Sequence, residues 1–476
     1  MNRWSMYIDG EWVQARSSQS YDVINPATAA KVGEAPYGDG EDARLAVLAA
    51  DRAFKDWSRL PAKERAAYIH RIADIMGERK EELAEIITLE MGKPLSEARS
   101  EVLISMDYLR WNAEEGVRNY GHVIPAPVAN KRLLTVRQPV GSVAAITPWN
   151  FPLSMAARKL GPALVSGCTV VLKPALQTPG AAVKWVEIAE QAGLPKGVVN
   201  LVTGNPEGIG NELLSSPEIK KITFTGSTAV GKKLLSAAAG QVKKMSMELG
   251  GHAPFIIFDD ADLDMAVIGA LNSKFRNAGQ TCICANRIYV HASVAENFLN
   301  KFKEAVGRLR LGDGFQAETT IGPVIDRRAL DKVEYHVSDA VSKGASIITG
   351  GKRMEGSEGY FYEPTILSNV DENMVIMNDE TFGPVAPVHV FHTEEEVIAK
   401  ANNTPYGLAA YFYTRDMART IRVYEALEYG IIGCNDAVPT TVQGPFGGWK
   451  ESGMGREGGP GSINDFLETK FVSIQI

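Results

Sequence analysis

The pattern of apolar and polar positions changes once along the chain. Before residue 140, apolar residues recur at helical spacing in long segments, which predicts helices over residues 41–57, 62–90 and 96–115. After residue 140, short runs rich in Val, Ile, Leu and Thr alternate with helical segments of about ten residues. Continuous apolar runs of this kind are typical of parallel strands buried on both faces. The second pattern therefore predicts consecutive βαβ units.

These units fall into two series, separated by Glu248–Gly251. In the first series, strands are expected at 143–149, 169–174, 198–204 and 221–227, and helices at 181–192, 209–214 and 230–239. In the second, strands are expected at 254–260 and 287–291, and helices at 263–277, 294–309 and 330–343. Two such units usually meet across a crevice, where ligands bind at the carboxyl ends of the strands.

Composition narrows the class of protein. With 476 residues, 45% of them hydrophobic and 22% charged, the chain is long enough for two or three domains of ordinary globular type. A net charge of −7 argues against a nucleic-acid surface, which would be basic. Four cysteines are not expected to form a disulfide framework, and we expect neither a signal segment nor a membrane-spanning run. We expect a cytoplasmic protein that binds neither nucleic acid nor membrane, and we assign no metal site.

Cys282 is the most informative single position. It ends the segment Gly279-Gln-Thr-Cys282, between an expected helix and an expected strand. A structural cysteine normally lies on an apolar face, whereas this one lies among small and polar residues. It is therefore a candidate nucleophile, the alternative being a loop cysteine without a role.

Two further residues offer chemistry that a thiol would use. Glu248 ends a strand-like run before two glycines and is a candidate general base, or else an exposed loop glutamate. Asn150, in the segment TPWNFP, is a candidate oxyanion donor, or else the cap of the following helix. Together the three residues suit a hydrolase as well as an oxidoreductase.

A dinucleotide site is indicated less clearly, because the G-x-G-x-x-G fingerprint is missing. A glycine turn from Gly226 to Gly231 follows an expected strand and opens a helix, whose free N–H groups suit a pyrophosphate. Lys173 ends another strand, where a cation can reach a ribose or phosphate. The alternatives are an ordinary strand–helix turn and a solvated surface lysine.

Several motifs resemble those of the aldehyde dehydrogenase superfamily, in the same order and over nearly the whole chain. They are PWNFP (148–152), VLKP (171–174), FTGS (224–227), ELGG (248–251), GQTC (279–282), ETFGP (380–384) and PFGGWKESGMGRE (445–457). The resemblance implies an α/β fold with two doubly wound parallel-sheet domains and a small oligomerisation element. It suggests residues 1–119 and 140–251 for the dinucleotide-binding domain, 252–455 for the catalytic domain, and 120–139 with 456–476 for an element that forms dimers or tetramers.

The resemblance also implies roles for the candidate residues. Cys282 would attack an aldehyde, Glu248 would activate the water that hydrolyses the thioester, and Asn150 with the Cys282 N–H would form an oxyanion hole. The residues implied for NAD or NADP are Lys173, Leu176, Trp149, Gly226, Ser227, Gly231, Glu380 and Phe382. Because Leu176 stands where many NAD-specific relatives have a glutamate, NADP should be tolerated as well.

Within the superfamily, SKFRNAGQTCICANR and EALEYGIIGCN are very similar to the bacterial succinate semialdehyde dehydrogenases. That similarity assigns Arg158, Arg276 and Thr440 to the far carboxylate of the substrate, unless the arginines pair with protein carboxylates. The loop at 436–443 departs from the usual pattern, since it has Pro439 and has Thr440 in place of a serine. Sulfolactaldehyde and glutarate semialdehyde therefore remain alternative substrates.

Other interpretations stay open at this stage. Cys284 is either a partner of Cys282 in a strained regulatory disulfide or a thiol packed under the loop. An acylating enzyme that uses coenzyme A usually lacks the glutamate found here as Glu248, and a catalytically silent relative would be expected to lose Cys282 or Glu248. A thiol hydrolase lacks a histidine in a comparable motif, since His252 is expected to be a loop residue.

Overall fold

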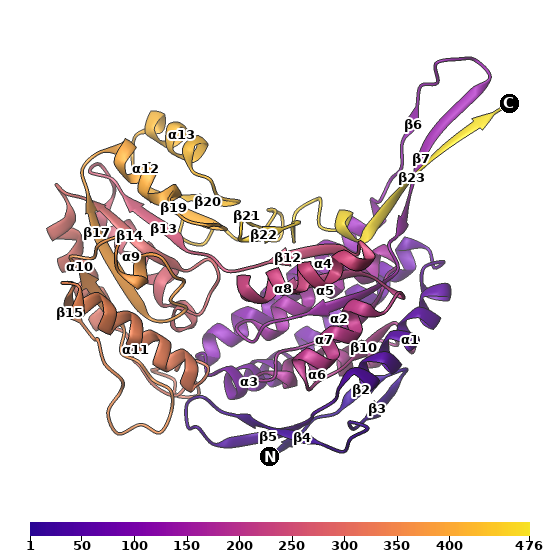
Figure 1. The fold of residues 1–476 in the computed structure, drawn as a ribbon, viewed down its shortest axis with the longest axis horizontal. Helices are drawn as coiled ribbons and strands as arrows, with labels where there is room; N and C mark the ends of the chain where they lie inside the picture. Colours follow the sequence, from indigo (N-terminus) through magenta and orange to yellow (C-terminus); the bar gives the residue numbers. More distant parts are fainter.

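The first part of the chain builds an eight-stranded sheet in the computed structural model, which describes all 476 residues (Figure 1). Five central strands are parallel, and three short strands join them antiparallel. The order across the sheet is β22 (Gly453–Met454), β12 (Lys244–Glu248), β11 (Ile219–Thr225), β8 (Ser142–Ile146), β9 (Thr169–Lys173), β10 (Val199–Leu201), β2 (Met6–Ile8) and β3 (Glu11–Val13).

Eight helices belong to this part, and the long N-terminal segment supplies four of them. They are α1 (Gly40–Trp57), α2 (Ala62–Glu78), α3 (Lys80–Met91), α4 (Leu95–Val117), α5 (Pro152–Ser166), α6 (Pro179–Gln191), α7 (Pro206–Ser215) and α8 (Thr228–Ala238). The single helix expected over 62–90 is wrong. The chain breaks at Arg79, whose φ of −97° and ψ of 20° leave the helical region while its guanidinium binds Glu82 and Glu187.

The second part builds a seven-stranded sheet that is parallel except at one edge. Its order is β15 (Ser346–Thr349), β16 (Thr365–Ser368), β17 (Val385–Phe391), β14 (Ala285–His291), β13 (Ala253–Ile257), β19 (Ala409–Tyr413) and β20 (Ile431–Cys434). Its helices are α9 (Leu263–Phe275), α10 (Ala295–Gly307), α11 (Arg327–Ser342), α12 (Glu394–Asn402) and α13 (Met417–Ala426). None of the chain's helices combines the length and apolar character needed to cross a bilayer.

Strand order explains where a ligand can bind. In the first sheet β8 and β11 are neighbours, but the chain runs from β8 to β9 and β10 on one side and from β11 to β12 on the other. The carboxyl ends at such a switch point border a crevice. The Asn150 turn follows β8, and Gly226 follows β11, so the fold brings two of the predicted segments to one edge.

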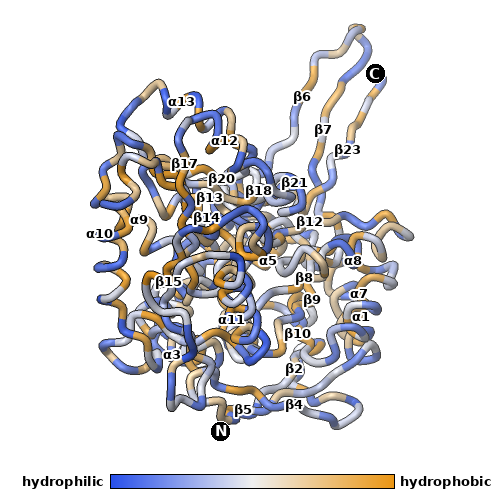
Figure 2. Tube along the Cα trace, turned by 60° about the vertical axis from the view of Figure 1, so that its left-hand side comes forward, coloured by the Kyte–Doolittle hydropathy of each residue, from blue (hydrophilic) through white to orange (hydrophobic).

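A three-stranded antiparallel sheet extends away from the rest of the molecule and carries the C-terminus (Figures 1 and 2). It consists of β6 (Val123–Ile124), β7 (Lys131–Pro139) and β23 (Leu467–Gln475), and we call it the arm. Residues 120–139 thus pair with the end of the chain, although more than three hundred residues separate them in sequence. Two small sheets complete the fold: β1 (Asn2–Arg3), β5 (Lys31–Pro36) and β4 (Ser20–Ile24) form one, and β18 (Tyr406–Gly407) and β21 (Trp449–Lys450) form the other.

Strand pairing follows the predicted division into parts with one difference. The strand β22 lies within 252–455 in sequence, yet it pairs with β12 at the edge of the first sheet. The C-terminal segment therefore returns to the first part before it enters the arm. The domain boundaries themselves stay a prediction.

Candidate active site

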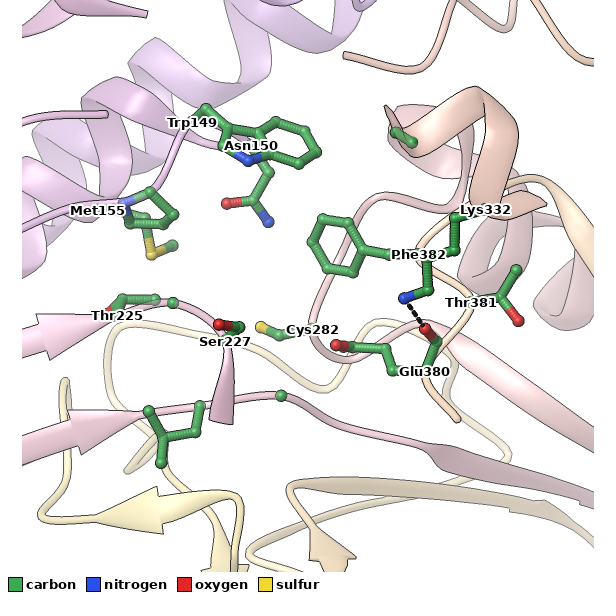
Figure 3. A pocket seen from close by; sticks show the side chains of 15 residues that line it. Trp149, Asn150, Met155, Thr225, Ser227, Cys282, Lys332, Glu380, Thr381 and Phe382 are labelled. Carbon is green, nitrogen blue, oxygen red and sulfur yellow. Dashed lines mark hydrogen bonds between the residues drawn. The ribbon is translucent and has the colours of Figure 1, made fainter. Parts of the chain in front are cut away.

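Two cavities meet at Cys282. The larger, of about 270 Å³, lies at the carboxyl ends of β8 and β11 (Figure 3). The smaller, of about 90 Å³, lies between α4, α5 and the segments 276–283 and 440–446. Cys282 and Met155 line both, so a thiol stands at the boundary of two binding spaces.

The loop that carries Cys282 is held in an unusual backbone conformation. Asn277, Ala278 and Gly279 have φ values of 53°, 54° and 76°, so the helix expected to reach residue 277 ends at Phe275. A side chain at Gly279 would meet the Gly383 carbonyl oxygen at 2.2 Å. Left-handed φ at non-glycine residues costs free energy and persists only where surrounding contacts impose it.

Gln280 supplies such contacts. Its side-chain amide donates to the carbonyls of Asn277 (3.0 Å) and Pro323 (3.2 Å), and its Oε1 accepts from the Ile325 N–H (2.8 Å). The backbone N–H of Cys282 donates to no protein group. The loop therefore presents both a thiol and a free N–H. Burial and the charges of Glu380 and Glu248 raise the pKa of this thiol to about 12, against the opposing charge of Arg158.

Asn150 lies beside the thiol. Figure 3 shows its amide pointing toward the sulfur of Cys282. The amide nitrogen also donates to the Gln280 carbonyl (3.1 Å), which fixes the side chain against the loop. The alternative role as a helix cap is wrong, because Phe151 occupies the N-cap of α5 and the Asn150 amide bonds to the Gln280 carbonyl instead.

Glu248 is the last residue of β12 and is only 3% exposed, so it is not a surface loop glutamate. Its Oε2 atom has no hydrogen-bond partner. Burial, and then the charge of Glu457, raise its pKa well above the ordinary value, while Arg158 and Lys159 act in the opposite direction. Such a carboxyl group can hold or accept a proton near neutral pH. It lines neither cavity, although its neighbour Leu249 lines the larger one.

Arg158 lines the smaller cavity and is paired inside the protein. Its Nε lies 2.9 Å from Oε2 of Glu457, whose other oxygen accepts from Lys159 Nζ at 2.6 Å. The guanidinium also lies 3.9 Å from the ring centre of Phe446. Its Nε and Nη2 are buried without a well-aligned hydrogen bond. The alternative expected for the arginines, pairing with a protein carboxylate, is therefore confirmed for Arg158.

Arg276 and Thr440 line the same cavity without such a partner. Arg276 has no carboxylate within ion-pair distance, although it interacts with the buried Glu97 through charge, and its guanidinium lies 5.6 Å from the ring centre of Phe151. The two guanidinium groups line this cavity and no carboxylate does, which favours an anionic ligand.

Ser154 also lines this cavity and was missed in the sequence. It is 4% exposed, and its N–H donates to Glu101. It precedes Arg158 by four residues and so lies on the same face of α5. That spacing is the signal that could have revealed it.

The predicted cofactor residues divide into two groups. Trp149, Gly226, Ser227, Glu380 and Phe382 line the larger cavity, whereas Lys173, Leu176 and Gly231 do not. A side chain at Gly231 would meet Leu249 at 2.5 Å, so this glycine permits close packing of α8. Lys173 is buried at the end of β9, and its Nζ contacts only the Pro174 carbonyl, at 3.3 Å. Burial lowers its pKa to about 8.

Glu380 and Phe382 are held from the second part of the chain. One oxygen of Glu380 accepts from the Gly251 N–H (3.1 Å), and its backbone carbonyl accepts from Lys332 (Figure 3). Burial raises the pKa of Glu380 to about 7. The rings of Phe382 and Trp149 lie edge to face, 5.5 Å apart, and join the two walls of the cavity.

Cys284 and His252 lie outside both cavities. Cys284 is buried, its sulfur lies 3.5 Å from the Lys274 carbonyl oxygen, and burial raises its pKa. All four cysteines are free thiols. His252 is a buried residue between β12 and β13, as expected for a loop position, and burial lowers its pKa well below the ordinary value.

Comparison with known proteins agrees with this geometry. Residues 12–472 match the aldehyde dehydrogenase family. The chain is 51% identical to the NADP(+) succinate-semialdehyde dehydrogenase GabD of Escherichia coli K12, over 99% of this chain and 98% of that protein. It is 52% identical to the 3-sulfolactaldehyde dehydrogenase of Pseudomonas putida, over 98% and 96% of the two chains. The crystal structure of an E. coli NADP-dependent enzyme, 50% identical, superposes with a TM-score of 0.99 and covers 100% of this chain and 98% of its own.

The match spans nearly the whole chain, and the solved structure repeats its fold. The α/β fold predicted from the motifs is thereby confirmed. The prediction that this protein is an enzyme that oxidises aldehydes is confirmed as well. The chain belongs to the aldehyde dehydrogenase family.

Proposed function

We propose that this protein oxidises a small anionic aldehyde, in the first place succinate semialdehyde, to the corresponding acid with NAD or NADP. The observation that carries the proposal is the pair of guanidinium groups, Arg158 and Arg276, in the small cavity that Cys282 also lines. An aldehyde with its carbonyl at the thiol places its far anion among these groups. Relatives of this chain act on succinate semialdehyde and 3-sulfolactaldehyde, which share that chemistry.

In this proposal Cys282 is the nucleophile. The thiol gives up its proton, its sulfur bonds to the aldehyde carbon, and the carbonyl oxygen becomes an oxyanion. The Asn150 amide and the free Cys282 N–H stabilise that charge. Because burial keeps the pKa of the thiol high, a base must accept its proton.

Glu248 accepts that proton in this scheme. After oxidation of the adduct, a thioester remains on Cys282. Glu248 must then pass the thiol proton on to solvent before it can act as a base again. The carboxylate next takes a proton from water, the hydroxide adds to the thioester carbon, and the carbon–sulfur bond breaks to release the acid and the thiolate. The raised pKa of Glu248 suits both transfers, since it brings the carboxyl group closer to neutral pH.

The residues around the larger cavity fit a nicotinamide dinucleotide. Lys173 Nζ keeps N–H bonds free for a ribose or phosphate, and the second carboxylate oxygen of Glu380 is free for ribose hydroxyls. Ser227 caps α8, whose N-terminus suits a pyrophosphate. When bound, the cofactor supplies the hydride acceptor. Leu176 neither binds the adenosine ribose nor repels a 2′-phosphate, which supports use of both NAD and NADP.

The choice among anionic aldehydes depends on the far end of the small cavity. Beside the two arginines, this cavity is lined by four residues with hydroxyl groups, Tyr108, Ser154, Thr281 and Thr440. Hydroxyl groups also suit a sulfonate, which has three oxygens. 3-Sulfolactaldehyde is therefore the second candidate substrate. Glutarate semialdehyde, which is one carbon longer than succinate semialdehyde, tests how long a substrate the small cavity accepts. A kcat/KM panel of these three aldehydes and an uncharged aldehyde of similar length, each with NAD and NADP, decides between them. Equal kcat/KM for the uncharged aldehyde would contradict an anion-binding cavity.

We also propose that the arm joins copies of this chain into dimers or tetramers in the cytoplasm. Its strands expose apolar side chains, including Val123 (87% exposed) and Phe471 (59% exposed). Light scattering on the intact protein and on Phe471→Glu gives the oligomeric state. A dimer or tetramer that Phe471→Glu dissociates supports this role, and an unchanged mass contradicts it.

Reversible oxidation of Cys282 with Cys284 stays a separate hypothesis. The two thiols are separated by one residue, but Cys284 packs under the loop with its sulfur near Lys274. Peroxide inactivation followed by recovery in reductant tests the hypothesis. Equal recovery in Cys284→Ala would rule out the disulfide.

A further inference from the structure

A buried ion pair lies directly behind Asn150. Lys93, just before α4, and Glu101, within α4, approach to 2.6 Å between Nζ and Oε2, and neither side chain is exposed at all. Removing two charges from water is costly, so a buried pair adds little to stability compared with apolar packing. The contacts of this pair indicate that it holds neighbouring backbone segments in position.

The lysine holds the Asn150 turn. Its Nζ donates a second hydrogen bond to the backbone carbonyl of Asn150 (2.8 Å) and lies 3.8 Å from the ring centre of Phe151. The turn is thereby fixed on the side opposite the cavity. A backbone carbonyl bonded to a buried ammonium has little freedom to rotate, which limits rotation of the side chain at the same residue.

The glutamate holds the helix that follows. Its second oxygen accepts from the N–H groups of Leu153 (2.9 Å) and Ser154 (3.2 Å), in the first turn of α5. No residue next to α5 caps this end, so Glu101 supplies the cap from another helix.

The same face of α4 reaches the loop of the nucleophile. Glu97, one turn before Glu101, accepts from the Asn277 N–H (2.9 Å). The Asn277 side chain donates to the Asn150 carbonyl (3.0 Å) and to the Gln280 carbonyl (3.1 Å). The Asn150 carbonyl thus receives bonds from Lys93 and from the catalytic loop, and joins the two segments at one atom.

From these contacts we propose that Lys93 and Glu101 are positioning residues that align the Asn150 amide with Cys282 for the oxyanion. This inference rests on the proposed function of Asn150. Loss of the pair should lower kcat about 10- to 100-fold, as expected for a partly misaligned oxyanion donor, and should change KM for aldehyde and cofactor less than about threefold.

The test combines the pair with Asn150. Lys93→Met alone leaves Glu101 buried and unpaired, so the double variant Lys93→Met/Glu101→Gln, which removes both charges, is used beside it. Each is measured with Asn150 present and with Asn150→Ala. A large loss of kcat with Asn150, and less than about threefold further loss without it, supports the proposal. Equal losses in both backgrounds would show that the pair acts elsewhere and would overturn it.

A control separates position from stability. Lys221→Met removes an equally buried lysine, from β11, where it bonds to Ser246. We expect it to lower Tm as much as the Lys93 variants do while kcat stays within about twofold. A parallel fall of kcat and Tm in both would overturn the inference. Full activity of Asn150→Ala would instead refute the proposed oxyanion role of Asn150, and the inference with it, while leaving Cys282 and the arginines untouched.

Discussion

Nε of Arg158 lies 2.9 Å from Oε2 of Glu457, and this ion pair distinguishes Arg158 from Arg276, the other arginine of the small cavity. Arg158 is paired directly with a protein carboxylate, whereas Arg276 interacts with the buried Glu97 only through charge at longer range. The positive charge available to a ligand therefore comes chiefly from Arg276. Replacing the two residues should have different consequences.

Arg276→Met should raise KM for succinate semialdehyde about 10- to 100-fold, because a charge-assisted contact to the far carboxylate is lost. Tm should change less than in an Arg158 variant, since Glu97 interacts with Arg276 through charge and not through a direct contact. Steady-state kinetics with succinate semialdehyde and an uncharged aldehyde checks this. Arg158→Met should weaken substrate binding and also lower Tm, because Glu457 then keeps only Lys159. Loss of activity on both aldehydes alike in Arg276→Met would contradict an anion-binding role.

The resting state of Cys282 gives a pH prediction. Burial raises its pKa, so the thiol is neutral at pH 7 and the reactive thiolate increases about tenfold for each pH unit below that pKa. Alkylation of Cys282 by iodoacetamide in the cofactor-free protein should therefore be about 100-fold faster at pH 9 than at pH 7. Mass spectrometry of the Cys282 peptide measures the rate, with the Cys434 peptide as internal reference. A plateau reached below pH 8 would mean that the thiol is ionised at rest.

Much of this site followed from the sequence because its motifs are local. Cys282, Asn150 and Glu380 each lie in a short segment whose residues already suggest a turn or a strand end. Lys93, Glu101 and Asn277 could not be found in that way. Their contacts with the Asn150 turn and the start of α5 join residues 50 or more positions apart, and a buried lysine has the same sequence signal as an exposed one. The break at Arg79 was missed for a similar reason, since it depends on contacts with Glu187 from another helix.

Arg287 supplies a prediction on stability. This buried residue donates to the carbonyls of His252 (2.9 and 3.1 Å), Lys400 (3.1 Å) and Ala401 (2.9 Å), and to the hydroxyl of Tyr429 (2.9 Å). A lysine ammonium cannot donate to all of these oxygens at once. Arg287→Lys should therefore lower the free energy of unfolding by about 2–4 kcal/mol. Urea denaturation at fixed protein concentration measures it.

The exposed Arg415, paired with Asp262 at 2.8 Å, is a matched control. Arg415→Lys should change the free energy of unfolding by less than about 0.5 kcal/mol. Equal effects of the two substitutions would mean that the carbonyl contacts of Arg287 add nothing to stability.

Cofactor choice can be tested at Leu176. A glutamate there would place a negative charge near a 2′-phosphate, so Leu176→Glu should lower kcat/KM with NADP about 10- to 100-fold and spare NAD. Leu176→Gln is similar in size to the glutamate but uncharged, and it should affect both cofactors equally. If the glutamate and glutamine variants behaved alike, repulsion of the phosphate would not be the reason.

Ser154 offers a way to separate the candidate substrates. This residue lines the small cavity, one helical turn from Arg158. A carboxylate has two oxygens for the arginines and Thr440, whereas 3-sulfolactaldehyde adds a third anionic oxygen and a hydroxyl next to the aldehyde. Ser154→Ala should therefore lower kcat/KM for 3-sulfolactaldehyde about tenfold and for succinate semialdehyde less than about threefold.

Ser166 is a suitable control for that substitution, because it is a buried serine at the far end of the same helix and lines neither cavity. Ser166→Ala should leave the ratio of the two kcat/KM values unchanged. If Ser154→Ala also left the ratio unchanged, the hydroxyl would face the cavity without contacting substrate. A loss confined to 3-sulfolactaldehyde would instead make Ser154 a residue by which this chain distinguishes a sulfonate from a carboxylate, since both anions meet the same two arginines.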